Sequence, residues 1–161
     1  MASDNPLREQ LVAFLTWGDA HADFDAASGG VPSALQGKRP KGAEHSPWEV
    51  LEHMRIAQRD ILDFIRDPKH VSPEFPKGYW PTSPAPPNDK AWNRSAEAFR
   101  ADLKAMIELI EKSSTDLLAP MPHGDGKTIL REVLLLADHN AYHLGQLVII
   151  RRLLDAWHPS A

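Results

Sequence analysis

The chain has 161 residues, no cysteine, and a formal net charge of -4 from 18 basic and 22 acidic side chains. This length suits one domain over residues 1–161, and folding at this size removes roughly 70% of the extended chain's surface from water. The missing cysteines exclude disulfides, zinc–thiolate sites, iron–sulfur clusters and a cysteine nucleophile, and any metal would have to be bound by nitrogen and oxygen.

The charge pattern contains no long basic run, so neither nucleic acid nor a membrane is an expected partner. The N-terminus lacks the basic head and apolar block of a signal peptide, and no apolar stretch reaches about 18 residues. We therefore expect a cytoplasmic protein.

Apolar residues repeat at helical spacing in four stretches, which predicts four helices. The first begins at Asn5 and Pro6, a cap and a favourable first helical position, and is expected to continue to about Asp25. Its apolar residues are Leu7, Leu11, Phe14, Leu15 and Trp17. Residues 26–45 are rich in Gly, Ser, Lys and Pro, which predicts a connection long enough for the first two helices to run parallel or to cross.

The second helix is expected to begin at the sequence Ser-Pro-Trp-Glu, residues 46–49. There Ser46 can cap the helix, Pro47 suits its first position, and Glu49 can reach back to the cap amide. The pair Asp67 and Pro68 ends the helix, because a proline disfavours helical backbone in the residue before it.

The segment 68–88 contains seven of the fourteen prolines together with Phe75, Tyr79 and Trp80. It has too many prolines for regular structure and too many aromatic residues for a plain linker. We therefore expect an ordered flap and refer to residues 68–88 by that name.

The third helix is expected from about Asp89 to Lys112, followed by a loop over residues 113–127. Thr128 can cap the fourth helix, whose apolar repeat continues as far as Trp157. Four helices without a convincing strand predict an all-α four-helix bundle.

His139 and His143 form the most informative pair in the sequence, because a spacing of four residues places two imidazoles on one face of a helix. They lie on a stripe that also contains Glu132, Leu135, Gln146 and Ile150. His53 occupies the second helix, and folding could bring it to the pair. Residue spacing alone leaves two interpretations open, an ordinary hydrogen-bonded core and a metal site.

Two common metal-site classes do not match the sequence. The zinc-protease signature requires Glu directly after the first histidine, where this chain has Asn140. A ferritin-like di-iron site requires Glu three residues before its histidines, and those positions hold Val50, Leu136 and Asn140. A mononuclear three-histidine site remains, for which Zn, Ni, Fe or Mn are suitable.

Two stretches carry a family resemblance: Ser-Pro-Trp-Glu-Val-Leu-Glu-His, which ends at His53, and Asp-His-Asn-Ala-Tyr-His-Leu-Gly-Gln, residues 138–146. They resemble the DinB-like superfamily, which includes YfiT-type metal-dependent hydrolases, and the likeness extends over nearly the whole chain. The resemblance implies an up-up-down-down four-helix bundle, a homodimer, and a divalent ion bound by His53, His139 and His143.

The resemblance also implies chemistry on a small-molecule substrate, because the family includes thiol-dependent S-transferases and an isomerase that uses a low-molecular-weight thiol. A bound ion, Zn or Ni in first place and Fe or Mn as alternatives, would activate either water for hydrolysis or a thiol for transfer. Without cysteine in the chain, that sulfur would come from a low-molecular-weight cosubstrate. The alternative is a non-catalytic helical stress-response or interaction protein.

Several residues near the motifs are candidates for supporting roles. Gln146 can hydrogen-bond a bound water, a substrate or a neighbouring backbone group, and it is one of two catalytic candidates. The other is His123, which could reach the open face of the site from its loop as a general acid or base. Asp60 and Asp138 can accept the second imidazole proton of a ligand histidine, or they are solvated surface carboxylates.

Three aromatic residues, Tyr79, Trp80 and Trp92, could roof the pocket or simply pack in the protein. Arg151 and Arg152 could hold an anionic substrate, although basic residues are expected near a helix C-terminus in any case. The remaining histidines lie outside any motif and are expected at the surface or in caps: His21, His45, His70 and His158.

Overall fold

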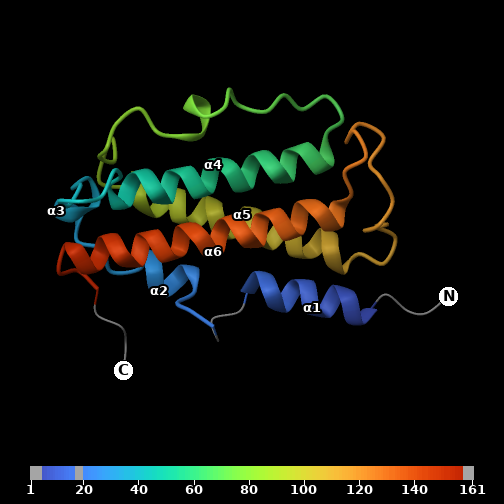
Figure 1. Cartoon of the computed structure of the whole chain (residues 1–161), viewed down its shortest axis with the longest axis horizontal. Coiled ribbons are helices and arrows are strands. Elements are labelled where there is room, and N and C mark those ends of the chain that lie inside the picture. Colours follow the sequence, from blue (N-terminus) through green and yellow to red (C-terminus); the bar gives the residue numbers. More distant parts are fainter. Residues whose placement is uncertain (1–4, 17–19, 158–161) are drawn as a thin grey trace.

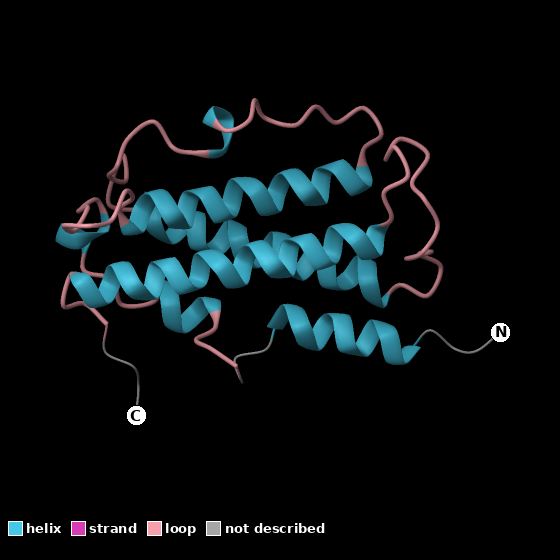
Figure 2. Cartoon of the chain, in the orientation of Figure 1, coloured by secondary structure: helices cyan, strands magenta, loops and turns pink. Residues whose placement is uncertain are grey.

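The computed structural model describes residues 5–16 and 20–157, which contain helices and no strand (Figure 1; Figure 2). The helices are α1 (Asn5–Thr16), α2 (Phe24–Ser28), α3 (Ser33–Gln36), α4 (Pro47–Arg66), the 3-10 helix η1 (Lys77–Tyr79), α5 (Ala91–Glu111) and α6 (Ile129–Leu153). The predicted all-α class is confirmed. None of the helices in the described ranges is long and apolar enough to cross a membrane.

The ends of α4 are set by the residues that the sequence indicated. The Ser46 hydroxyl accepts a hydrogen bond from the Glu49 amide at 3.2 Å, and the Glu49 carboxylate accepts one from the Ser46 amide at 2.8 Å. This reciprocal pair satisfies two amides that have no partner within the helix. At the other end Asp67 is extended and Pro68 follows, so α4 ends at Arg66. Both predicted boundaries are confirmed.

The third and fourth predicted helices are α5 and α6. The Thr128 hydroxyl accepts a hydrogen bond from the Arg131 amide at 3.1 Å, which confirms the predicted cap of α6. The helix ends at Leu153, before the predicted end at Trp157. Asp155 has a φ of 54°, in the left-handed region, and this turn stops the helix.

The first predicted helix is interrupted. It was expected to reach about Asp25, but α1 ends at Thr16 and the short helix α2 begins at Phe24. The Asp23 carboxylate caps α2 by accepting a hydrogen bond from the Ala26 amide at 2.7 Å, and a residue in this role has extended backbone. A continuous helix cannot pass through such a cap. The predicted helix position of Trp17 lies outside the described residues.

The predicted connection over residues 26–45 contains the end of α2 and the short helix α3 (Figure 1). It leads from α2 to the N-terminus of α4, at the same end of the bundle as the C-terminus of α6.

The order of helix directions differs from the up-up-down-down order that the family resemblance implied. Glu52 of α4 contacts Ser95 of α5, and further along both helices Arg66 contacts Ala105. The residue numbers of the contacting pairs increase in both helices, so α4 and α5 are parallel. In Figure 1, α1 and α6 run opposite to them. The flap makes α4 and α5 parallel, because it returns from the C-terminus of α4 to the other end of the bundle before α5 begins.

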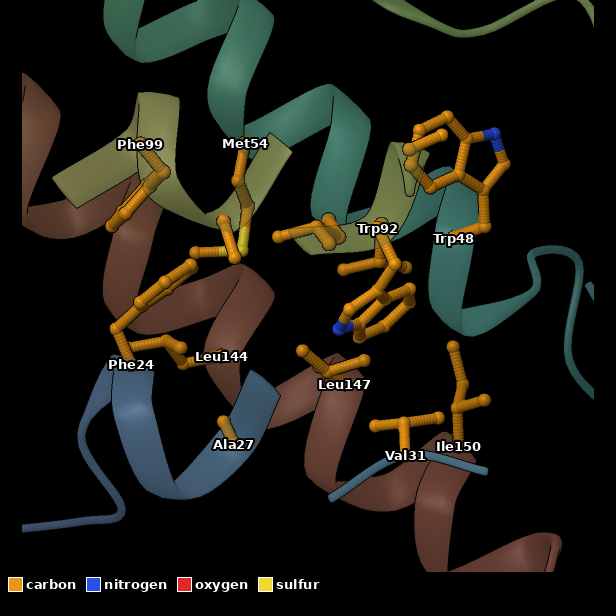
Figure 3. Close-up of a cluster of buried hydrophobic side chains, with 14 residues drawn as sticks. Phe24, Ala27, Val31, Trp48, Met54, Trp92, Phe99, Leu144, Leu147 and Ile150 are labelled. Atoms are coloured by element: carbon orange, nitrogen blue, oxygen red, sulfur yellow. The ribbon is translucent and has the colours of Figure 1, made fainter. Parts of the chain in front are cut away.

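Two apolar clusters fill the space between the helices. The cluster near the N-terminus of α4 is shown in Figure 3, and within it the Phe24 ring stacks on Phe99 with centroids 3.9 Å apart. Its labelled members are Phe24, Ala27, Val31, Trp48, Met54, Trp92, Phe99, Leu144, Leu147 and Ile150. The second cluster lies toward the opposite end of α4 and contains Leu11, Ile61, Leu62, Ile65, Met106, Ile110, Leu117, Met121, Val133 and Leu136. Together they fix α4 against α5 and α6.

The flap runs back along α4 toward the N-terminus of that helix. Near the C-terminal half of α4, the Asp60 carboxylate contacts His70 and Tyr79 of the flap. At the N-terminus of α4, the Pro84 carbonyl accepts a hydrogen bond from the Ser46 hydroxyl at 2.5 Å. The expected ordered flap is therefore held at both ends of the helix.

Candidate metal centre

Three imidazoles meet between α4 and α6. The Nε2 atom of His53 lies 3.1 Å from Nε2 of His143 and 3.0 Å from Nε2 of His139. His53 and His143 are buried, and His139 is partly exposed. In the described part of the chain, these three form the group of metal-ligating side chains whose donor atoms lie close enough to share one ion.

Helix geometry explains why these imidazoles converge. His139 and His143 are one turn apart on α6 and therefore project from the same face. The antiparallel packing of α4 on α6 places His53 opposite them. A buried hydrogen bond, from the Asn140 amide to Gln58 Oε1 at 3.1 Å, links the two helices beside the cluster.

Hydrogen bonds on the far side of two rings determine which nitrogens carry protons. Nδ1 of His53 donates to the Tyr79 carbonyl at 2.8 Å, and Nδ1 of His143 donates to Oε1 of Gln146 at 2.7 Å. A neutral imidazole has a single N–H, so both Nε2 atoms present lone pairs. Two lone pairs that face each other at 3.1 Å repel unless a cation lies between them.

Burial keeps the three rings neutral, which is the state that a metal requires. Burial, reinforced by the neighbouring imidazoles, lowers the pKa of His139 to about 4. The same causes lower the pKa of His143 to about 4, and burial also lowers the pKa of His53. At neutral pH all three nitrogens are therefore available as ligands.

Two of the three separations between donor atoms match those expected around a divalent cation, and all three donor atoms lie within 4.8 Å of one another. Zinc–nitrogen bonds of about 2.0–2.1 Å place two nitrogens on one ion roughly 2.9–3.4 Å apart, depending on the coordination angle. The measured separations of 3.0 and 3.1 Å lie in this interval. Three neutral ligands leave the dipositive charge of such an ion uncompensated, which favours Lewis acidity.

One flap residue and one loop residue extend the site: Trp80, which the sequence offered as a candidate roof, and His45, which it did not. The Trp80 ring stacks on His53, with centroids 4.0 Å apart and planes 3° from parallel. His45 stacks on the other face of the same indole at 3.9 Å. His45 was expected at the surface or in a cap. The one available signal was its position directly before the cap residue Ser46, which places it near the start of the same helix as His53.

Of the two catalytic candidates, the structure places Gln146 at the cluster and His123 away from it. Gln146 contacts the Nδ1 edge of His143 rather than the Nε2 side. His123 bonds the Phe64 carbonyl at 2.8 Å, three turns along α4 from His53. The structure thus does not bring His123 to the open face of the site.

The carboxylates proposed as partners of the ligand histidines do not contact them. Asp60 lies two turns from His53, and its partners are His70 and the Tyr79 hydroxyl, each at 2.6 Å. Asp138 is exposed on α6. The imidazoles of His53 and His143 are oriented instead by a backbone carbonyl and an amide side chain.

Two further candidates have structural roles elsewhere. Trp92 is buried in the apolar core and donates to the Ser28 carbonyl at 3.2 Å, so it does not roof the site. Arg151 is buried and donates to the carbonyls of Ala27 and Ala156 at 2.7 and 2.9 Å. It therefore holds α2 and the turn that follows α6 rather than an anionic substrate.

Among the remaining histidines, His70 bonds Asp60 and is only partly exposed, contrary to the expectation of a surface or cap position. His21 is exposed, as expected. His158 lies outside the described residues.

A family model described as the DinB superfamily matches residues 17–147. The chain belongs to the DinB superfamily. The match covers α4, the flap, α5 and most of α6, and therefore includes all three imidazoles. Comparison with the curated proteins and with the solved structures gives no match. Membership in the DinB superfamily and the three clustered histidines agree on a metal site, and neither specifies a reaction.

Proposed function

We propose that this DinB superfamily member is an enzyme that uses a divalent metal ion, held by His53, His139 and His143, to act on a small molecule. The observation that carries the proposal is the pair of Nε2 lone pairs facing each other at 3.1 Å, each fixed by a hydrogen bond on the opposite side of its ring. An ordinary hydrogen-bonded core would place a donor against an acceptor at this point.

A bound ion would supply Lewis acidity and lower the pKa of a coordinated water or thiol. The chain's own contribution is to present three neutral nitrogens and to hold two of the rings in place. We favour zinc or nickel because imidazole suits both metals, with iron or manganese as alternatives.

The first experiment is elemental analysis of untagged protein beside a His53→Ala, His139→Ala, His143→Ala variant. The exposed His21 supplies a matched control, since His21→Ala also removes an imidazole but leaves the cluster intact. We expect about one ion per chain in the parent and the control, and none in the folded triple variant. Absence of metal from the parent after reconstitution with zinc, nickel, iron and manganese would refute the proposal.

Hydrolysis and thiol transfer remain two branches of the proposal. Because the chain has no cysteine, a transferase would need a low-molecular-weight thiol as cosubstrate. Turnover of a panel of esters, amides and carbon electrophiles, measured with and without such thiols, separates the branches. Turnover that is independent of thiol would exclude the transferase.

A non-catalytic metal site is the second candidate, and a specific observation favours it. The Trp80 ring covers one face of His53, and the Tyr142 ring lies edge-on to His143 with centroids 4.9 Å apart. Aromatic rings against two of the three histidines would suit a closed site that only ties α4 to α6. Azide or a thiol added to cobalt-substituted protein distinguishes the candidates, because a saturated site would leave the visible spectrum unchanged.

We also propose that the protein is a homodimer. The support is an apolar stripe on α6 that remains exposed in the single chain, formed by Leu135, Tyr142, Ile149 and Leu153. Sedimentation equilibrium of the parent and of a Tyr142→Glu, Ile149→Glu variant tests the assembly. A monomeric parent would exclude it.

A further inference from the structure

Asp60 connects the flap to α4 at a distance from the imidazole cluster. It lies two helical turns after His53 on the same side of α4, and its carboxylate is only 11% exposed. One carboxylate oxygen accepts a hydrogen bond from Nε2 of His70, and the other accepts one from the Tyr79 hydroxyl, both at 2.6 Å. Both partners belong to the flap, so a single side chain fixes the flap at two points.

Tyr79 continues this connection to the cluster. Its hydroxyl binds Asp60, while its backbone carbonyl accepts the Nδ1–H of His53 at 2.8 Å. The next residue, Trp80, stacks on the His53 ring. Tyr79 thus contacts Asp60 through its side chain and His53 through its backbone.

We propose that Asp60 is a positioning residue for His53, acting through Tyr79 to hold the imidazole in the tautomer that presents Nε2 to the cluster. The expected effect on metal affinity rests on the proposed function. The expected effect on the His53 tautomer applies to the metal-free chain as well.

The hydrogen bond between Tyr79 and Asp60 has the geometry of a strong contact. The Tyr79 phenol is protonated at neutral pH, as phenols ordinarily are, so its hydroxyl is a donor toward Asp60. A hydrogen bond from a hydroxyl to an ionised carboxylate is short and roughly twice as strong as a bond between neutral groups. The separation of 2.6 Å between Tyr79 and Asp60 is in the range expected for such a bond.

Loss of this contact would release the carbonyl that fixes the His53 proton. The ring could then place its proton on Nε2, where it would compete with a cation. Groups that orient a metal-binding histidine typically change metal affinity by about 10- to 100-fold when they are removed. We expect Asp60→Ala to fall in this range, although Asp60 would contact neither the ion nor its ligands.

The first arm of the test is ¹⁵N NMR of the metal-free protein, which reports the tautomer of His53 directly. In the parent we expect the proton on Nδ1. In Asp60→Ala we expect a mixture of tautomers, and in Asp60→Asn a return toward the parent, because the amide oxygen can still accept from Tyr79. Asp63→Ala is the matched control: it removes a carboxylate from the same helix, one that bonds Arg59 rather than a residue of the flap.

The second arm measures zinc affinity by competition with a chromogenic chelator. We expect a loss of about 10-fold or more in Asp60→Ala, a smaller loss in Tyr79→Phe, and no loss in Asp63→Ala. The double variant Asp60→Ala, Tyr79→Phe should bind no more weakly than Asp60→Ala alone, because both substitutions break one connection. Tyr79→Phe retains the ring and the carbonyl and decides the question if Asp60→Ala does not fold.

The outcomes separate this inference from the proposed function. A His53 that keeps the Nδ1 proton in folded Asp60→Ala and Tyr79→Phe would overturn the positioning role, whether or not the parent binds metal. If the parent binds no metal but its His53 tautomer changes in Asp60→Ala, the proposed function fails and the positioning role stands. Unchanged zinc affinity in both variants of a metal-binding parent would also overturn the inference.

Discussion

The two halves of the α4–α6 interface bury side chains of opposite kinds. Toward the C-terminus of α4, Leu62 packs in an apolar cluster with Val133 and Leu136, and all three are fully buried. Toward the N-terminus of α4, the same two helices bury His53 and His143. The apolar half gains free energy from burial alone, whereas the histidine half requires partners for its polar atoms. One pair of helices therefore combines a region that stabilises the fold by apolar burial with a region whose buried polar atoms need partners.

The apolar half should show the largest response to substitution. Leu136→Ala removes a fully buried side chain, and we expect a loss of about 2–5 kcal/mol in the free energy of unfolding, because a cavity remains. Urea denaturation of metal-free protein measures it. His139→Ala is the contrast, and a comparable loss there would mean that the imidazoles are ordinary core residues.

Metal should stabilise only through the histidine half. At a free zinc concentration 100-fold above Kd, we expect an increase of about 2.7 kcal/mol in the free energy of unfolding of the parent. The increase should persist in Leu136→Ala and vanish in the triple histidine variant. Urea titrations with and without zinc, using a chelator for the metal-free state, provide the measurement. Equal stabilisation of the triple variant would place the metal elsewhere.

Gln146 should affect metal affinity without affecting the apolar half. Gln146→Ala removes the acceptor that fixes the His143 proton on Nδ1, and we expect zinc affinity to fall about 10-fold. Asp138→Ala, an exposed position on the same helix, should leave the affinity unchanged. Isothermal titration calorimetry distinguishes the two variants. Similar affinities would show that Gln146 does not orient the ligand.

The metal-free histidine half should also respond to acid. The pKa values of His139 and His143 are lowered from 6.5 to about 4 in the folded chain, so the unfolded chain binds more protons in this interval. Stability is therefore fully present above pH 6.5 and falls as the pH drops toward 4. The measurement is the free energy of unfolding in urea between pH 7 and 4, for the chelator-treated parent and the chelator-treated triple variant. Parallel profiles would contradict the prediction.

Local signals predicted the local parts of the structure. The cap at Ser46 and Glu49 and the cap at Thr128 act within one helical turn, so adjacent residues suffice to identify them. The spacing of His139 and His143 is also local to one helix. The convergence of His53 with this pair required the family resemblance, because spacing cannot show which helix faces meet.

The features that sequence reasoning did not predict depend on contacts between distant residues. Sequence reasoning named Trp80 as a candidate roof and Asp60 as a candidate partner of an imidazole. It did not show that Trp80 lies between His53 and His45, or that Asp60 bonds the flap instead. No periodicity marks the residues of an irregular segment that will face a helix. The parallel α4 and α5 were missed for the same reason, because the direction of α5 depends on the path of the flap.

The separation of the imidazoles along the chain bears on when the protein can acquire its ion during synthesis. His53 and His143 are 90 residues apart, and the second helix of the pair ends at Leu153. At about 5–20 residues per second, translation needs roughly 5–18 s to pass from one histidine to the other. Throughout that interval a nascent chain displays His53 without its partners. An ion that needs all three imidazoles can therefore bind only after synthesis has passed His143.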